Sequence, residues 1–343
     1  MATPDKTRIA KPSPIVEDDQ GQLVAKKGVS REVIQELSKI KGEPDWMAEL
    51  RLKSFDIFER KPVPTWGVDL SGLDLDELVL YSPPEAGRFD SWDDVPAEMK
   101  KTYEDLGIPQ AERDHLAGVV GVWRQEPVYE GLKKEYADLG ILFCSMDTAI
   151  TEYPELVQEY FMKKCVPPQD NKFSALHGAV WSGGSFLYVP KGVKVDLPLQ
   201  AYFRMEGANE GTFEHTLIIA DEGSEVNYIE GCTAQTYSVN SMHSAVVEIF
   251  VKEGAKARYT TVQNWSKDIY NLNTKRAIVE AEGTVEWVGG SMGAKVVMLY
   301  PGSFLMGEGA RADHLNVGVA SGDVWKDTGA KVVHLAPNTT SNI

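Results

Sequence analysis

Three cysteines, Cys144, Cys165 and Cys232, carry the most reactive side chains of the sequence, and they lie far apart. No CxxC pair is present, so the spacing predicts no disulfide framework. Cys144 (ILFCSMD) and Cys165 (FMKKCVPP) stand in apolar segments, which favours a packing role. Cys232 stands in NYIEGCTAQ, where a thiolate could act as a nucleophile or as a soft ligand for iron or sulfur. An inert buried cysteine is the alternative that this residue alone leaves open.

Four further side chains could complete a site around Cys232: Arg204 (YFRME), Gln263 and Trp265 (TVQNW), and Lys275 (NTKRA). Gln263 and Trp265 are two residues apart, so on a strand they point to the same side. If these side chains point inward, they mark a polar passage, because buried polar and charged groups must be paired. If they point outward, they are ordinary surface residues. The sequence alone does not set the strand register that decides between the two.

Several classes of site are absent from the sequence. The six histidines form neither HxH nor HExxH, so no zinc motif is supported. No GxGxxG follows a strand pattern, and there is no GxxxxGK[ST] phosphate loop and no GxSxG elbow. The chain is therefore not expected to bind ATP as a P-loop protein or to act as a serine hydrolase.

The net charge and the hydropathy of the chain argue against some classes of partner and indicate a compartment. The 343 residues carry a formal net charge of −16, which argues against nucleic acid and against anionic membrane surfaces as partners. No stretch approaches the roughly 18 apolar residues of a membrane span, and MATPDKTRIAKPSP has no secretory apolar region. Reduced, unpaired cysteines fit a cytoplasmic location.

The chain divides into three regions by composition. Residues 1–30 are polar and are expected to form a flexible leader. Residues 31–170 are expected to form a helical region, with Ser30 as the N-cap of its first helix. Helical patterns are found at 31–40, 46–59, 93–105, 110–123, 127–138 and 152–164. From residue 171 to 343, Gly, Val, Thr and aromatic residues with a period of two predict strands.

A repeat runs through the strand-rich region. Five segments share one layout, PKGVKVDL, DEGSEVNY, KEGAKARY, AEGTVEWV and GEGARADH, with their glycines at Gly192, Gly223, Gly254, Gly283 and Gly309. Successive glycines lie 31, 31, 29 and 26 residues apart, about the length of one coil of a β-solenoid. Each glycine suits a turn that needs a positive φ. We therefore expect a β-helix, with an antiparallel β-sandwich as the alternative.

Long motifs resemble the SufB branch of the SufB/SufD family. They are PPQDNKFSALHGAVWSGGSFLYVPKGVKVDLPLQAYFRM, EGCTA, SVNSMHSAVVEIF, TVQNW and DTGAKVVHLAPNTTS, and they occur in the family's order over roughly residues 118–343. The resemblance implies a right-handed parallel β-helix that serves as a scaffold, not an enzyme, on which a nascent iron–sulfur cluster forms. It also implies the partners: SufD or a second SufB, the ATPase SufC, and a cysteine desulfurase or sulfur carrier.

The resemblance also implies roles for the residues named above. Cys232 matches the family's sulfur-accepting cysteine, which would carry a persulfide. Arg204, Gln263, Trp265 and Lys275 match residues proposed to line an internal path from that cysteine. Where relatives can carry Asn, this sequence has Glu206, which puts that point of the path in doubt. The resemblance leaves open whether reduced flavin binds.

Family members continue past the NTTS motif with further coils, a second key cysteine, a glutamate and a region that docks SufC. The sequence ends at Ile343, so we expect the β-helix to be incomplete at this end. A fragment, an intein junction and a stand-alone short form are the competing explanations. A pairing subunit like SufD, without sulfur chemistry, and an inactive N-terminal piece of SufB are the alternative functions.

Overall fold

The computed structural model describes most of the chain: residues 15–17, 23–25, 27–81, 89, 95, 97, 100–101, 104, 115–205, 209–234 and 241–343. Most of the expected leader lies outside these residues. Its described part includes two short antiparallel strands, β1 (Ile15–Glu17) and β2 (Leu23–Ala25). The helix expected at 93–105 also lies largely outside the described residues.

Two helices open the helical region as predicted. Helix α1 (Arg31–Ile40) begins at Ser30, whose side chain accepts a hydrogen bond of 3.2 Å from the backbone N–H of Val33. Helix α2 is Asp45–Arg60. The later helices are α5 (Lys134–Ala137), α6 (Met146–Glu152), α7 (Pro154–Tyr160) and α8 (Lys172–Val180). No described helix is long and apolar enough to cross a membrane.

The helical predictions at 110–123 and 127–138 are wrong over residues 118–132. There the chain forms β3 (Gly118–Trp123) and β4 (Glu126–Leu132), because β3 pairs with a strand some eighty residues later in the chain. Long-range pairing overrides a local pattern in such cases. Conversely, α8 lies at the start of the region expected to hold only strands. Its N-cap, Asn171, accepts hydrogen bonds from the backbone N–H groups of Phe173 and Ser174.

Two large sheets make up the rest of the fold. The first contains, in order, β21 (Thr340–Asn342), β18 (Arg311–Gly318), β15 (Thr284–Met292), β13 (Lys256–Asn264), β10 (Glu225–Ala234), β7 (Leu199–Met205), β3 and β4. The main path of the second contains β19 (Trp325–Thr328), β16 (Val296–Leu299), β14 (Ile269–Val279), β12 (Val246–Val251), β9 (His215–Ala220), β6 (Gly184–Val189) and β5 (Leu142–Ser145). Off this path lie β17 (Gly302–Leu305), β20 (Lys331–His334), β11 (Ser241–His243) and β8 (Gly211–Thr212).

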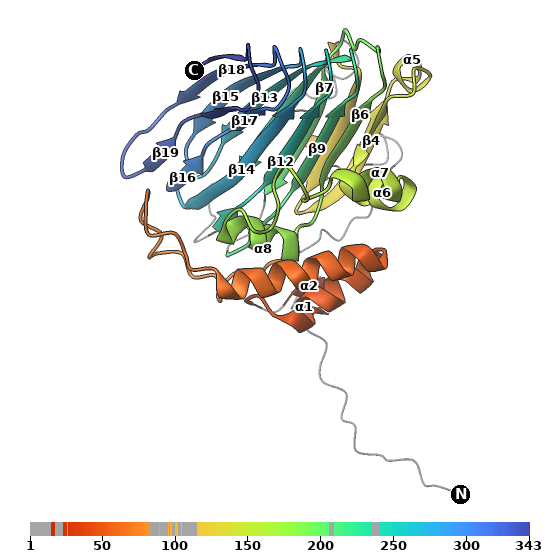
Figure 1. The fold of residues 1–343 in the computed structure, drawn as a ribbon. Coiled ribbons are helices and arrows are strands. Elements are labelled where there is room, and N and C mark those ends of the chain that lie inside the picture. The colour runs from red at the N-terminus through yellow and green to blue at the C-terminus, as the bar shows by residue number, and fades with distance from the viewer. Residues whose placement is uncertain are drawn as a thin grey trace, which may run out of the picture.

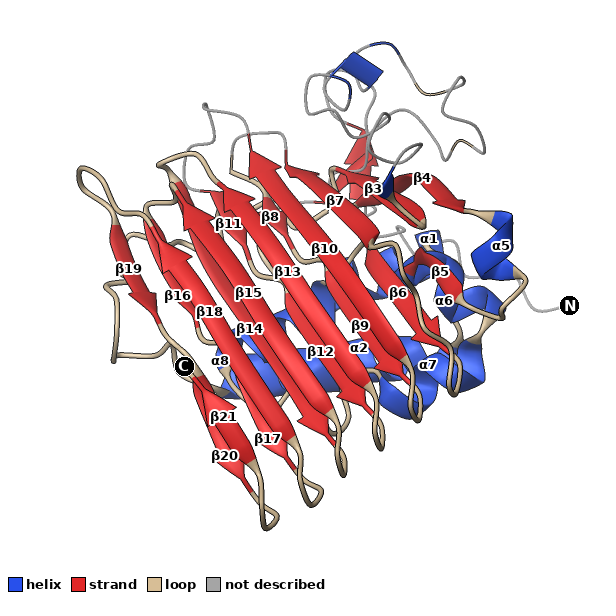
Figure 2. Ribbon diagram, turned by 90° about the horizontal axis from the view of Figure 1, so that it is seen from above, coloured by secondary structure: helices blue, strands red, loops and turns tan. Residues whose placement is uncertain are grey.

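Parallel pairing between successive coils confirms the predicted β-helix. Strand β10 pairs in parallel with β7 on one side and β13 on the other, and β12 pairs in parallel with β9 and β14. The chain alternates between the sheets and advances by one strand in each with every coil (Figures 1 and 2). An antiparallel sandwich would need hairpins between neighbouring strands, so that alternative is wrong.

The repeated glycines mark the turns, with one exception. Gly192, Gly223, Gly254 and Gly309 have φ between 65° and 72°, as predicted. At the fourth turn the positive φ, 54°, belongs to Glu282 and not to Gly283. The backbone N–H of Glu282 also makes the coil-to-coil hydrogen bond, to the carbonyl of Glu308. The prediction for Gly283 was therefore off by one residue.

The two sheets and the helices form three layers (Figure 1). One apolar core lies between the sheets and includes Leu187, Ile218 and Val247. A second core lies between the outer face of the second sheet and the helices, and it includes Trp181 of the α8 end and Phe213. The helices therefore cover the outer face of the second sheet. A site between the two sheets is enclosed by one sheet on each side.

Candidate functional site

Cys232 points into the space between the two sheets. Along β10 the buried positions are Val226, Tyr228, Glu230 and Cys232, and the residues between them are partly exposed. This alternation is the period of two that a strand imposes. The Cys232 side chain is fully buried, so the interior of the β-helix holds a cysteine and a carboxylate on consecutive inward positions.

The Cys232 thiol contacts the Glu230 carboxylate. Its Sγ donates to Glu230 Oε1 over 3.6 Å. Burial, and then the charge of Glu230, raise the pKa of the thiol well above its ordinary value, while the Lys275 ammonium acts in the opposite direction. Cys232 is therefore a protonated thiol, and its proton points toward the Glu230 carboxylate.

Lys275 neutralises the buried carboxylate. Its Nζ lies 3.2 Å from the same Glu230 Oε1 and 2.6 Å from the hydroxyl oxygen of Tyr259. Burial opposes the charge on Glu230, but the Lys275 charge and the hydrogen bonds from Tyr259 and Lys275 outweigh it and hold the pKa of Glu230 below its usual value. The second carboxylate oxygen accepts from Thr216 over 3.2 Å. The interior thus holds one ionised, fully bonded pair beside the cysteine.

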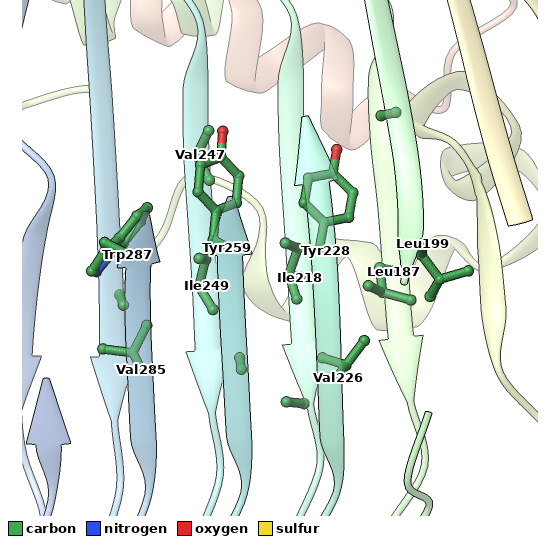
Figure 3. Packing of buried hydrophobic residues seen from close by; sticks show 14 of the residues in the cluster. Leu187, Leu199, Ile218, Val226, Tyr228, Val247, Ile249, Tyr259, Val285 and Trp287 are labelled. Atoms are coloured by element: carbon green, nitrogen blue, oxygen red, sulfur yellow. The ribbon is translucent and has the colours of Figure 1, made fainter. Parts of the chain in front are cut away.

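Aromatic rings line up next to this pair in successive coils; Tyr228 and Tyr259 are stacked, and Tyr259 and Trp287 meet edge to face. Figure 3 shows Tyr228, Tyr259 and Trp287 side by side on neighbouring strands, pointing into the interior. Ring centroids are 5.6 Å apart between the tyrosines and 5.2 Å apart between Tyr259 and Trp287. The Lys275 ammonium lies 4.7 Å from the centroid of Tyr259. Of the three rings, Tyr259 is therefore the one that contacts the lysine, through both its hydroxyl group and its face.

Gln263 occupies the inward position next to Cys232 in the following coil, because these two residues are register partners. Its Oε1 accepts from Trp265 Nε1 over 3.4 Å and from Asn271 Nδ2 over 2.8 Å. This fixes the orientation of the amide, and among the described residues its Nε2 has no hydrogen-bond partner. A buried, unsatisfied donor thus lies beside the cysteine, which is unusual in native interiors.

A second polar chain continues from Gln263. Asn271 Oδ1 contacts His243 Nδ1 at 2.9 Å, and His243 Nε2 lies 2.9 Å from Glu214 Oε2. All three side chains are buried. The structure therefore brings Cys232, Gln263, Trp265 and Lys275 into one interior region.

Arg204 takes a different place. On β7 the inward residues are Phe203 and Met205, and Arg204 lies between them on the outer face. Its guanidinium donates to Thr233 Oγ1 over 3.0 Å, so it reaches the back of β10 beside Cys232. The predicted interior position of Arg204 is wrong in this structure, because adjacent strand residues point to opposite faces. Glu206 lies outside the described residues.

The sequence patterns did not single out five residues of this network: Glu230, Tyr259, Glu214, His243 and Asn271. Glu230 had a usable signal, since it precedes Cys232 by two residues and must share its face on a strand. The others come from neighbouring coils, and only the register brings them together. Cys144 on β5 and Cys165 after α7 are buried, consistent with the predicted packing role. Across the described ranges, no group of three or more His, Cys, Asp or Glu side chains is placed to hold a metal ion.

A separate buried network lies under the helices. His177 of α8 contacts His215 over 3.1 Å, and His215 Nε2 lies 3.2 Å from Glu248 Oε2. The Glu248 carboxylate accepts from the backbone N–H groups of Met162 and Val166. It thereby ties the segment after α7 to the second sheet, on the opposite side of that sheet from Cys232.

Comparisons with known proteins decide the family. Residues 203–343 match the family model described as the SufBD core domain of SUF-system FeS cluster assembly, and residues 97–201 match the SufBD N-terminal region. The chain is 50% identical over 319 residues to the iron–sulfur cluster assembly protein SufB of Bacillus subtilis, covering 93% of this chain and 68% of that protein. It is also 50% identical over 327 residues to a SufBD family protein of Staphylococcus epidermidis, covering 95% and 70%. The chain belongs to the SufBD family of iron–sulfur cluster assembly proteins.

The interior network lies within the SufBD core match. Cys232, Glu230, Gln263 and Lys275 all fall in residues 203–343. The region that matches the SufBD N-terminal model contributes α5 to α8 and the strands from β3 to β6, and with them part of the cover on the second sheet. In this SufBD protein the core domain therefore carries the buried cysteine and the N-terminal region helps to enclose it.

Proposed function

We propose that this SufBD protein is a non-enzymatic scaffold of the SUF system that receives sulfur on Cys232. The observation that supports the proposal is the arrangement of Glu230 and Lys275 around a fully buried thiol. Glu230 offers a base within reach of the thiol proton, and Lys275 offers a positive charge for the anionic sulfur that follows.

The transfer step would balance without an external oxidant or reductant. Cys232 sulfur attacks the outer sulfur of a donor persulfide, and the donor's S–S bond breaks as the new S–S bond forms. The electron pair leaves on the donor sulfur, and the Cys232 proton passes by way of Glu230 to that leaving thiolate. The new terminal sulfur is anionic, so the Lys275 ammonium and the free N–H of Gln263 Nε2 favour it.

Partners follow from the family and are part of the proposal. A cysteine desulfurase or sulfur carrier would supply the persulfide, and a SufC-type ATPase would supply ATP hydrolysis. SufD or a second SufB would pair with the β-helix. The nascent iron–sulfur cluster is the cargo, with reduced flavin as a further candidate cofactor, and the site of action is the cytoplasm.

Persulfide trapping tests the proposal. The chain is exposed to a persulfide donor, alkylated with a reagent that retains sulfane sulfur, and examined by mass spectrometry. We expect the added sulfur on Cys232 and its loss in Cys232→Ser, with Cys144→Ser and Cys165→Ser unaffected. Label on Cys144 or Cys165 alone would refute the assignment.

A pairing role without sulfur chemistry is the second candidate. Beyond residues 311–313, where β21 pairs with it, β18 and the residue after it expose Leu315, Val317 and Val319, each more than half accessible, and exposed apolar patches commonly mark contact surfaces. The same trapping experiment separates the two functions, because a pure pairing subunit would leave Cys232 unlabelled.

A further inference from the structure

A pocket of about 280 Å³ lies on the outer side of the second sheet, between β14, β16, α8 and the chain that follows α2. It is separate from the interior that holds Cys232. Lys275 of β14 points inward, so the adjacent residue Arg276 points outward and lines the pocket. The volume is close to the lower end of the range for small-ligand pockets, about 300–1,000 Å³. The pocket is therefore large enough for a small organic molecule.

Three aromatic side chains line this pocket. Trp66, in the chain after α2, is 63% exposed, although large apolar side chains are usually covered. Phe173 of α8 is buried, and Tyr300, just after β16, is partly buried. The Tyr300 hydroxyl donates to Asp327 Oδ1, which holds the ring in place. An exposed indole beside two further rings offers a surface on which a flat apolar group can pack.

The pocket also holds one cation and one anion that contact each other. Arg276 Nη2 donates to Asp170 Oδ2 over 3.3 Å. Its Nη1 donates to the backbone carbonyls of Lys275 and Tyr300. A guanidinium has five N–H donors, so two of them, including Nε–H, have no partner among the described residues.

The Arg276–Asp170 pair has free bonding capacity on both sides. Asp170 Oδ1 accepts no hydrogen bond within the described ranges, because the bonds from Asn171 and Arg276 both go to Oδ2. Neither Arg276 Nε nor Asp170 Oδ1 is a fully buried atom without a partner, so both are open to solvent. Gly302, the register partner of Arg276, leaves room for the guanidinium arm, since a Cβ there would lie 2.8 Å from Arg276 Cδ.

We propose that this pocket binds a free α-amino acid with an aromatic side chain. The ligand carboxylate takes the spare donors of Arg276, the ammonium pairs with Asp170 Oδ1, and the ring packs on Trp66. An α-amino acid carries its two charges on neighbouring groups of one carbon atom, which matches a cation and an anion that touch. A ligand that has only the carboxylate would leave the Asp170 charge unpaired beside its own, so it should bind more weakly. The proposal does not depend on sulfur transfer at Cys232.

Fluorine NMR tests the site, with para-fluoro-L-phenylalanine titrated into the full chain. We expect saturable binding that L-phenylalanine displaces and that phenylpropionate, which lacks the ammonium, displaces poorly. Trp66→Ala should weaken binding about tenfold, because the ring of the ligand loses an aromatic contact. Trp325→Ala is the matched control, since Trp325 on β19 is 67% exposed and does not line the pocket. It should keep the affinity of the parent.

Asp170→Asn tests the charge of the site. The amide oxygen can still accept from Asn171 and Arg276, and both Asp170 and Trp66 are exposed, so folding should be retained in either variant. We expect Asp170→Asn to bind phenylalanine about tenfold more weakly and phenylpropionate more tightly, because the ammonium loses its partner and the carboxylate no longer meets a like charge. A structural role of Asp170 alone would not change this ratio.

Three results would each overturn the site. They are absence of saturable binding by the parent, equal binding by Trp66→Ala and Trp325→Ala, and an unchanged ratio of the two ligands in Asp170→Asn. None of them would alter the persulfide label on Cys232, because the pocket and the interior lie on opposite faces of β14. The amino-acid site and the sulfur-accepting role of Cys232 therefore fail separately.

Discussion

Lys275 Nζ and the Cys232 thiol share one acceptor, Glu230 Oε1, at 3.2 Å and 3.6 Å. All three side chains are buried between the sheets. A buried carboxylate that binds both a cation and a thiol links the charge of the lysine to the state of the sulfur. A substitution of Lys275 should therefore alter the protonation of the Cys232 thiol through Glu230.

Removing the lysine should leave an uncompensated charge in the core. We expect Lys275→Met to lower the free energy of unfolding by about 3–5 kcal/mol, the usual cost of breaking a buried pair by deleting one partner. Urea denaturation measures the loss. The double variant Lys275→Met/Glu230→Gln should recover part of it, because no charge is then stranded. Strictly additive losses would show that the pair is not coupled.

The Tyr259 hydroxyl should also stabilise this pair. Tyr259→Phe keeps the ring in the stack but removes the group 2.6 Å from Lys275 Nζ. We expect a loss of about 1.5–3 kcal/mol in unfolding free energy, as for a hydrogen bond to a charged group. Tyr270→Phe is a suitable comparison, because Tyr270 is a buried tyrosine on the helix side of the second sheet. A smaller loss for Tyr259→Phe than for Tyr270→Phe would contradict the role given to this hydroxyl.

The β-helix architecture could be predicted from the sequence because the signals for it are local. Turn glycines and strand alternation repeat with each coil, so the β-helix could be predicted without knowing any contact. Register is not local, and it decides which side chains meet. The position of Arg204 shows the consequence, since one residue along β7 separates the outer face from the interior. Strand β3 was missed for a similar reason, because its partner β7 lies far along the chain.

Glu248 should make stability depend on pH. Burial raises its pKa to about 8 from an ordinary value of 4.5, against the two backbone hydrogen bonds that lower it. The folded state therefore binds this proton more tightly than the unfolded state. The stabilisation is complete below pH 4.5 and is lost as pH rises through 8, at up to about 1.4 kcal/mol per pH unit.

Urea unfolding between pH 6.5 and 8.5 isolates this effect. Burial lowers the pKa of the neighbouring His215 to about 3, so its contribution is lost only at acid pH, as the pH falls below 6.5. We expect stability to fall across the window in the parent and to stay level in Glu248→Gln. Glu253→Gln, an exposed change on the turn after β12, should keep the slope of the parent. An unchanged slope in Glu248→Gln would refute the assignment.

Gly231 should be sensitive to the smallest side chain, because it lies directly before Cys232 and under the Tyr202 ring. A Cβ at this position would lie 2.8 Å from Tyr202 Cδ2. The ring has little freedom to move, since its hydroxyl hydrogen-bonds Thr233 Oγ1 at 2.5 Å. We expect Gly231→Ala to cost about 1–3 kcal/mol, as overpacking does. It should also lower persulfide labelling of Cys232, because β10 must shift.

Gly290 provides the control for this change. It lies in the same row of register partners, two strands away, and a Cβ there would meet no atom closer than 4.0 Å. Gly290→Ala should therefore leave both the unfolding free energy and the labelling of Cys232 close to the parent values. Equal losses in the two variants would mean that helical or strand propensity, and not the contact with Tyr202, governs this row. A loss confined to Gly231→Ala would show that the contact between β10 and Tyr202 determines the position of the Cys232 sulfur.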